Sequence, residues 1–223
     1  MKKTPYALPR AVLWDWDNTL VDSWNNIHRA LAETFVHMGR APWTLEETKK
    51  NVHRALEDSF PPLFGEKWRE AGKYYRSTFE RIHLDGLASL PGAEGTLAYL
   101  RERGVYCAVV SNKRGENLRR ESGHLGWNAH FSGVFGALDV PAAKPAPDLV
   151  TKALENSGIS AGKDVWLVGD SLSDMRCAHA SGCVPVLFGD ASHVDPAELA
   201  LCPPDYRASN HAALQELLRG TAQ

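Results

Sequence analysis

Short apolar runs alternate with amphipathic stretches along most of this chain, and this pattern predicts the order of its elements. Apolar runs predict buried strands at about residues 11–16, 105–110, 134–138, 165–168 and 184–187. Apolar positions at helical spacing predict helices over about residues 93–103, 115–123, 148–156, 172–181 and 211–219. Because strands that alternate with helices form parallel sheets covered on both faces, the pattern indicates an α/β fold.

A block of helical patterns interrupts this alternation between residues 21 and 90, where no strand is predicted. Its expected helices cover about residues 22–38, 44–60 and 63–84. Thr44 and Glu47 form a capping-box pattern at the start of the second helix. We expect Pro61 and Pro62 to end that helix, because proline has no backbone N–H to donate.

The length of the chain agrees with two domains. Its 223 residues exceed by about half the roughly 150 residues of an average domain. We assign residues 1–20 and 91–223 to one domain, a Rossmann-like three-layer core with a parallel sheet. Residues 21–90 form the other domain, which is all-α and inserted after the first strand.

The composition is that of an ordinary globular protein and excludes several classes of partner. Hydrophobic residues make up 43% of the chain, and the net charge is −2. Without a basic excess we expect no nucleic-acid partner, and without an apolar run of about 20 residues we expect no membrane partner. The four cysteines lack C-x-x-C spacing and the first residues do not form a signal-peptide pattern, so we expect a cytoplasmic protein without disulfides or structural zinc.

Polar side chains follow four of the predicted strands, at the end where parallel sheets bind their ligands. These residues are Asp15, Asp17, Ser111, Asn112, Lys144, Asp170 and Asp174. Taken alone, each has an ordinary structural explanation as a turn-forming aspartate, a helix cap or a solvated lysine. Strand alternation, however, places Asp15 and Asp17 on the same side of their strand, and carboxylates held that close need a cation nearby.

In their order and spacing these residues resemble the motifs of the haloacid dehalogenase superfamily, in its phosphatase branch with a helical cap. The matching motifs are D-x-D-x-T from Asp15 to Thr19, Ser111, Lys144, and G-D-S-x-x-D from Gly169 to Asp174. The segments LPGAEGTLAYLRERGVYCAVVSNK, KPAPD and VGDSLSDM are similar to those of phosphoglycolate-phosphatase-like members. Asn18 stands where many relatives carry glycine, and asparagine is the non-glycine residue that best tolerates a left-handed backbone.

The resemblance implies a phosphatase that acts through an aspartyl-phosphate. It implies that Asp15 is the nucleophile and that Asp17 protonates the leaving oxygen and then deprotonates the attacking water. It also implies that Ser111 and Lys144 hold the phosphoryl oxygens, together with backbone N–H groups near Asn112. Because the dehalogenases lack an aspartate at the position of Asp17, its presence argues against halide chemistry.

The same resemblance implies one Mg²⁺ ion as the cofactor. Its expected ligands are the Asp15 carboxylate, the Asp17 backbone carbonyl and Asp170, and hard oxygen ligands of this kind suit Mg²⁺. Asp174 is expected either to reach the ion through a water molecule or to orient Lys144. The sequence leaves both roles open.

In this superfamily the residues between the first two motifs form a lid that selects the leaving group, and residues 21–90 occupy that place here. Arg54 lies where relatives often carry a specificity loop, so it is a candidate substrate contact; the alternative is a solvated arginine. We expect a small phosphorylated metabolite as the partner, with phosphoglycolate as the leading substrate, and a monomer or homodimer.

Other activities stay open at this stage. Lys49 and Lys50 fall where phosphonate hydrolases carry a Schiff-base lysine, whereas residues 47–60 lack the glycine of the sugar-phosphomutase cap segment. Pyrophosphatase activity is a further alternative. A non-enzymatic phospho-receiver domain takes its acidic pair and its phospho-accepting aspartate from different strands, whereas Asp15 and Asp17 share one strand.

Overall fold

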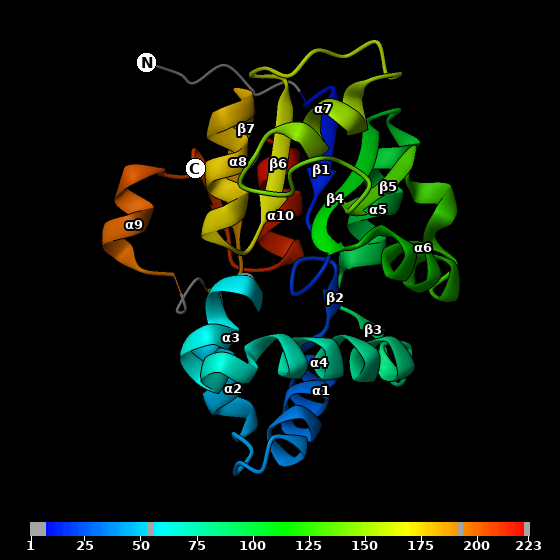
Figure 1. The fold of residues 1–223 in the computed structure, drawn as a ribbon. Coiled ribbons are helices and arrows are strands. Elements are labelled where there is room, and N and C mark those ends of the chain that lie inside the picture. The colour runs from blue at the N-terminus through cyan, green and yellow to red at the C-terminus, as the bar shows by residue number, and fades with distance from the viewer. Residues whose placement is uncertain (1–7, 53–55, 191–193, 221–223) are drawn as a thin grey trace. The chain divides into compact units, whose positions relative to one another are not determined.

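The structure is a computed structural model that describes residues 8–52, 56–190 and 194–220, and the chain divides into two compact units. One unit comprises Met1–Val21 and Ser89–Gln223, and the other comprises Asp22–Ala88. The first unit contains a parallel sheet, and the second is helical (Figure 1). The lid function expected of the inserted helices stays a prediction.

The sheet of the larger unit has six strands, and every neighbouring pair is parallel. The strands are β1 (Ala11–Trp14), β4 (Tyr106–Arg114), β5 (Gly133–Ala137), β6 (Val165–Gly169), β7 (Val184–Phe188) and β8 (Tyr206–Ala208). Their order is β5-β4-β1-β6-β7-β8, so β1 lies inside the sheet. All five predicted strands are present. The sequence does not predict β8, because its three residues contain no apolar run.

Helices cover both faces of this sheet (Figure 1). They are α5 (Ala93–Glu102), α6 (Gly115–His124), α7 (Asp148–Leu154), α8 (Leu172–Ser181), α9 (Pro196–Leu201) and α10 (His211–Leu218). On the face covered by α7 and α8, Leu13 of β1 shares an apolar cluster with Leu149 and Cys177. On the face covered by α5, α6 and α10, the ring of Trp14 lies 6.1 Å from that of His211. This arrangement confirms the predicted three-layer α/β core.

The chain leaves β1 two residues earlier than predicted because it enters a tight turn. The Trp16 carbonyl accepts hydrogen bonds from the backbone N–H groups of Leu20 and Val21, at 2.9 and 3.2 Å. Asn18 adopts the left-handed conformation with a φ of 58°, as its place in the motif predicts. Trp16 is fully buried although it lies outside the strand, so the apolar pattern continues past the true strand end. The opposite error occurs in β4, which continues beyond the predicted residue 110 to Arg114.

The smaller unit contains α1 (Trp24–His37), α2 (Leu45–Asn51), α3 (Leu56–Phe64) and α4 (Trp68–Ile82). The capping box of Thr44 and Glu47 begins α2, as predicted. The prediction that Pro61 and Pro62 end this helix is wrong, because α2 already ends at Asn51 and both prolines lie inside α3. Phe60 and Phe64, on either side of the prolines, are buried in an apolar cluster with Leu31, Phe35 and Ala71. This packing outweighs the loss of two backbone donors.

Two further details depart from the predicted all-helical block. The third helix begins at Trp68 rather than near residue 63, because Gly65 is left-handed and opens a 3₁₀ turn over Gly65–Lys67. The two-residue strands β2 (Val21–Asp22) and β3 (Ala88–Ser89) also pair with each other where the chain enters and leaves the block. The sequence pattern predicts neither strand, since each is too short to show a period.

All four cysteines are buried and free of disulfide bonds, as the absence of C-x-x-C spacing predicts. Burial raises the pKa of the Cys107 thiol to about 11 and that of the Cys177 thiol to about 12, so both are protonated at neutral pH. Among the described residues, no helix combines the length and the apolar character that crossing a bilayer requires.

His211, the first residue of α10, connects that helix to the turn after β1. Its Nε2 lies 2.9 Å from the Thr19 carbonyl oxygen and donates a hydrogen bond to it, while Nδ1 is buried and finds no partner among the described residues. Its ring packs 4.8 Å from that of Phe188. Burial in these surroundings lowers the pKa of His211 to about 4.

This shift makes the fold sensitive to acid through His211. The unfolded histidine gains its proton near pH 6.5, whereas the folded one resists protonation down to about pH 4, so acid favours unfolding within this window. Replacing His211 with glutamine keeps an N–H donor but removes the titration. Between pH 6.5 and 4 we expect the free energy of unfolding of the native protein to fall by roughly 3 kcal/mol more than that of His211→Gln.

Urea unfolding at several pH values measures this difference. His124→Gln, at the exposed end of α6, is the matched control and should follow the native protein. Parallel pH profiles for the native protein and His211→Gln would contradict the prediction.

Candidate active site

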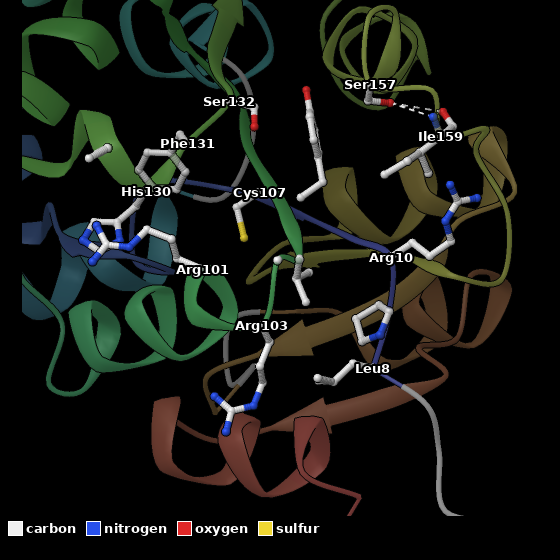
Figure 2. Close-up of a pocket in the computed structure, with 15 residues that line it drawn as sticks. Leu8, Arg10, Arg101, Arg103, Cys107, His130, Phe131, Ser132, Ser157 and Ile159 are labelled. Carbon is white, nitrogen blue, oxygen red and sulfur yellow. Dashed lines mark hydrogen bonds between the residues drawn. The ribbon is translucent and has the colours of Figure 1, made fainter.

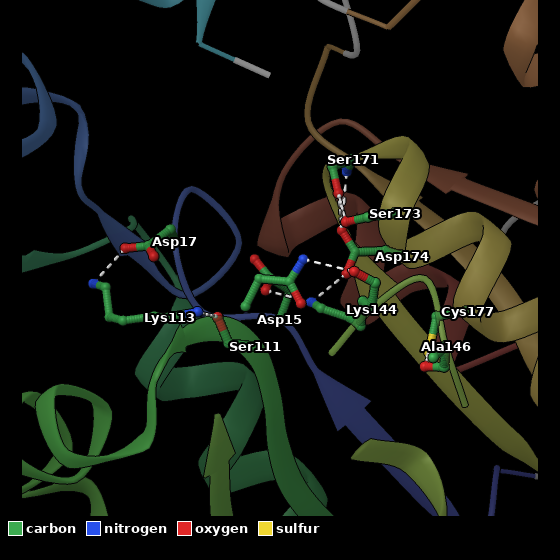
Figure 3. Close-up of polar contacts among 11 residues, drawn as sticks. Asp15, Asp17, Ser111, Lys113, Lys144, Ala146, Ser171, Ser173, Asp174 and Cys177 are labelled. Carbon is green, nitrogen blue, oxygen red and sulfur yellow. Dashed lines mark hydrogen bonds and ion pairs between the residues drawn. The ribbon is translucent and has the colours of Figure 1, made fainter. Parts of the chain in front are cut away.

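The carboxyl ends of the central strands bring a buried lysine between two aspartates. Asp15 follows β1, Asp174 lies in the first turn of α8, and Lys144 lies in the segment between β5 and α7. The Lys144 Nζ donates to Asp15 Oδ1 at 2.6 Å and to Asp174 Oδ1 at 2.5 Å (Figure 3). The lysine side chain is only 1% exposed. The structure thus joins three predicted site residues, of which Lys144 lies 129 positions from Asp15 and 30 from Asp174 in the sequence.

Asp174 is held by both of its carboxylate oxygens. Oδ1 accepts from Lys144, and Oδ2 accepts from the backbone N–H and the hydroxyl of Ser171 at 3.1 and 2.5 Å. The bond from the Ser171 N–H belongs to a capping box at the start of α8. A Cβ at Gly169 would lie 2.2 Å from the Asp174 carboxyl carbon, so this approach requires glycine. Of the two roles expected for Asp174, the contact that orients Lys144 is therefore present.

The electrostatics of the group show an excess of negative charge. Burial, reinforced by the carboxylates of Asp174 and Asp17, raises the pKa of Asp15 to about 6, although Lys144 opposes the shift. Burial and the carboxylates of Asp15 and Asp174 likewise raise the pKa of Asp170 well above its usual range. For Lys144 the two aspartates outweigh burial, so its pKa is raised and it stays charged.

A metal ion fits this excess charge. Asp15, Asp170 and Asp174 each offer a carboxylate oxygen, and these oxygens lie within 4.8 Å of one another. Three carboxylates beside one ammonium leave a formal excess of two negative charges, which a divalent cation balances. Carboxylate oxygens are the donors that hard cations such as Mg²⁺ prefer. The donor set and its charge therefore suit the metal that the sequence predicts.

Ser111 and Asn112 lie in β4, next to β1 in the sheet. Ser111 is buried, and its Oγ accepts a hydrogen bond from the Lys113 backbone N–H at 3.3 Å. The Asn112 side chain donates to the Lys144 carbonyl at 2.9 Å and so connects β4 to the segment that carries the lysine. The role of both residues toward a substrate stays a prediction.

Asp17 belongs to a second polar group, which the sequence pattern does not predict. Its Oδ1 accepts from the Lys113 Nζ at 2.6 Å, and Lys113 also donates to both carboxylate oxygens of Glu121 (Figure 3 shows the Asp17 contact). Strand alternation predicts Asp15 and Asp17 on one side, but β1 ends at Trp14, and each aspartate meets a different lysine.

One signal in the sequence points to Glu121. It lies three residues after Leu118 in α6, on the buried face of that helix, and is fully buried. A carboxylate at an apolar helical position needs a buried cationic partner. Glu121 therefore predicts that a lysine or arginine lies beside it, but the pattern does not say which one.

Arg54, the candidate substrate contact in the helical unit, lies outside the described residues. A cavity of about 720 Å³ is found elsewhere, near the amino ends of β1, β4 and β5 (Figure 2). Arg10, Arg101, Arg103 and His130 are among its lining residues. Since the described residues that line it include none of the predicted site residues, we place the candidate active site at the opposite, carboxyl edge of the sheet.

Comparisons with known proteins show what this chain is similar to. A family model described as "Haloacid dehalogenase-like hydrolase" matches residues 12–187, a range that includes Asp15, Lys144 and Asp174. The solved structure of the haloacid dehalogenase-like family hydrolase SP0104 from Streptococcus pneumoniae is similar, with a TM-score of 0.80 and 25% identity. The similarity covers 93% of this chain and 96% of that chain.

Curated relatives carry phosphatase names. One from Xylella fastidiosa, named phosphoglycolate phosphatase, is 30% identical over 195 residues, covering 85% of each chain. A second protein of that name, from Pseudomonas fluorescens, is 28% identical and covers 82% of this chain and 71% of its own. A relative from Caldanaerobacter subterraneus bears the name of a pyrophosphatase and is 30% identical, with 77% of this chain and 78% of its own covered.

The buried position of Lys144 predicts a large effect on stability. Lys144→Met removes the cation that Asp15 and Asp174 share, so we expect the free energy of unfolding to fall by about 3–5 kcal/mol. Urea unfolding at neutral pH in the presence of EDTA measures it. Lys152→Met is the matched control, because the exposed Lys152–Glu155 pair contributes about 1 kcal/mol or less. Equal free energies of unfolding for the two variants would show that the buried contacts of Lys144 do not contribute this stability.

Proposed function

Because the chain belongs to the haloacid dehalogenase-like hydrolase family, we propose that it is a Mg²⁺-dependent phosphatase that hydrolyses a small phosphate monoester. The observation that carries this proposal is the buried group of Asp15, Lys144, Asp170 and Asp174 at the carboxyl edge of the sheet. The group combines a nucleophilic carboxylate, an ammonium for the phosphoryl oxygens and oxygen ligands for a metal. The phosphatase names of several relatives support the same reaction class.

The first step transfers the phosphoryl group to the protein. An Asp15 oxygen bonds to phosphorus as the bond from phosphorus to the leaving oxygen breaks, and the electron pair stays on that oxygen. Asp17 gives the leaving oxygen a proton. Lys144, which holds Asp15 Oδ1, and Ser111 stabilise the phosphoryl oxygens.

The second step returns the protein to its starting state. A water oxygen bonds to phosphorus, and Asp17 takes a proton from that water. The bond between phosphorus and Asp15 breaks, so inorganic phosphate leaves and the carboxylate is restored. One aspartate thus acts first as acid and then as base, which balances the proton over the cycle.

Asp15, Asp170 and the Asp17 backbone carbonyl are the residues we assign to Mg²⁺, with Asp174 close by. When bound, the ion neutralises charge on the phosphoryl oxygens. Asp174 keeps Lys144 in place through the 2.5 Å contact, and Lys144 in turn keeps Asp15 oriented. Mn²⁺ offers the same preference for oxygen ligands, so the donor set suits both metals.

Phosphoglycolate is the substrate we propose first, because relatives of that name cover most of this chain. Pyrophosphate is the second candidate, on account of the relative with a pyrophosphatase name. None of the three relatives described above bears the name of a phosphonate hydrolase or a sugar-phosphate mutase. A panel of phosphorylated metabolites compared by kcat/KM ranks these candidates, since discrimination between substrates is expressed in that ratio.

We further propose that the helical unit, Asp22–Ala88, acts as the lid that selects the leaving group, with Arg54 as a contact. The expected small-metabolite partner, the monomeric or homodimeric state and the cytoplasmic location also stay proposals. A phospho-receiver role is disfavoured by the family match, which is to hydrolases. Incubation with p-nitrophenyl phosphate separates the two, because an enzyme turns over whereas a receiver keeps one phosphoryl group.

Asp15→Asn tests the nucleophile. The amide keeps the size of the side chain but cannot form the aspartyl-phosphate, so we expect turnover of p-nitrophenyl phosphate to be abolished. Circular dichroism should show a fold close to that of the native protein. Asp164→Asn, which removes one partner of an exposed ion pair with Arg10, should keep native activity. Native-like activity in Asp15→Asn would refute the mechanism.

Metal removal tests the cofactor. EDTA should remove activity and Mg²⁺ should restore it. The Mg²⁺ concentration needed for half-maximal activity should rise at least about ten-fold in Asp170→Asn, as weakening a metal's ligand set does. Mg²⁺ should also raise the Tm of the native protein, and less so that of Asp170→Asn. Full activity in EDTA would rule out the metal requirement.

A further inference from the structure

A second buried lysine, Lys113, connects the catalytic edge to the interior of the larger unit. Its Nζ lies 2.6 Å from Asp17 Oδ1, and 3.0 and 2.8 Å from Oε1 and Oε2 of Glu121. The Lys113 side chain is 7% exposed and that of Glu121 is fully buried. Charge-assisted contacts of this length have well-defined geometry, so the ammonium is fixed relative to both carboxylates.

Glu121 is itself fixed by an aromatic group. The Trp16 Nε1–H donates to Glu121 Oε2 at 2.6 Å. The fully buried Trp16 ring packs edge-on against Trp127 at 5.9 Å and Phe131 at 6.3 Å. Trp16 therefore orients Glu121, and Glu121 orients Lys113. The chain of contacts returns to Asp17, the residue after Trp16.

The two lysines divide the two aspartates of the D-x-D motif between them. Lys144 binds Asp15, and Lys113 binds Asp17. For Lys113, the carboxylates of Asp17 and Glu121 outweigh the opposing effect of burial and raise its pKa, so it is charged at neutral pH. Each aspartate thus has its own cation within hydrogen-bond distance.

We propose that Lys113, anchored by Glu121 and Trp16, is a positioning residue that fixes Asp17 for proton transfer. The inference rests on the proposed phosphatase function. Lys113 engages Asp17 Oδ1 at 2.6 Å and so restricts the rotation of the carboxyl group. Lys113 takes no proton itself. Proton transfer depends steeply on the position of the donor, so a mobile Asp17 is a poorer acid and a poorer base.

The test compares two substrates in Lys113→Met. An alkyl phosphate such as 2-phosphoglycolate needs a proton on its leaving oxygen, whereas p-nitrophenyl phosphate releases a weakly basic phenolate that does not. With the alkyl ester we expect kcat to fall roughly 10- to 100-fold, part of the 10²–10⁴-fold that acid–base catalysis supplies, with KM within about two-fold of native.

With p-nitrophenyl phosphate the first turnover should stay close to the native rate. Hydrolysis of the aspartyl-phosphate still needs Asp17 as a base, so the second step should slow. Stopped-flow measurements should therefore show a burst of nitrophenolate near one equivalent per enzyme, followed by slow turnover. Glu121→Gln, which weakens the anchor but keeps an acceptor for Trp16, should show the same pattern to a smaller degree.

Lys113→Met leaves Glu121 buried without its cation, which threatens folding. The double variant Lys113→Met/Glu121→Gln removes both charges, and it carries the same test if the single variant does not fold. Lys152→Met, which breaks an exposed pair on α7, is the control and should behave as the native protein.

The outcomes separate the inference from the function on which it rests. Suppose that the native protein is active. The positioning role alone would then be overturned if Lys113→Met lost first turnover equally with both substrates, or if it kept native kinetics with both. A native protein that turns over neither substrate would overturn the phosphatase proposal and the positioning role together. Substrate-dependent loss with a burst supports the inference, because a purely structural defect lowers both first turnovers alike.

Discussion

The larger unit depends on one interaction, the ammonium of Lys144 held between Asp15 and Asp174. Removing these charges from water costs several kcal/mol per ion, and only short contacts and further hydrogen bonds recover that cost. The fold provides them by ending β1 at Trp14 and by beginning α8 with a cap that engages Asp174. The apolar centre of the sheet thus ends in a charged group whose carboxylates still outnumber its cation.

The excess of carboxylates explains why two separate lysines contact the site. Carboxylates buried together repel one another, and cations in contact with them offset that repulsion. Lys144 satisfies the group of Asp15 and Asp174, while Lys113 satisfies Asp17 from the other side with help from Glu121. Two lysines from other parts of the chain, Lys144 and Lys113, therefore bind the two aspartates of one short loop separately.

The sequence predicts the fold better than it predicts these contacts. Apolar runs and polar strand ends identify five strands and the edge where the aspartates gather, because those features are local. The prediction that Pro61 and Pro62 end a helix is wrong, because the packing of Phe60 and Phe64 stabilises a helix that contains both prolines. β8 is too short to carry a pattern. The Lys113–Asp17 contact spans 96 positions, and no local signal pairs a particular lysine with a particular aspartate.

Because the chain divides into two compact units, one unit can vary in sequence while the other keeps the reaction groups. The helical unit has an apolar cluster of its own, formed by Leu31, Phe35, Phe60, Phe64 and Ala71. The reaction groups all belong to the other unit, and they act on the phosphoryl group rather than on what it is attached to. On the proposal that the helical unit selects the leaving group, substitutions in that unit alter the selection, while the carboxylates and lysines of the other unit stay as they are.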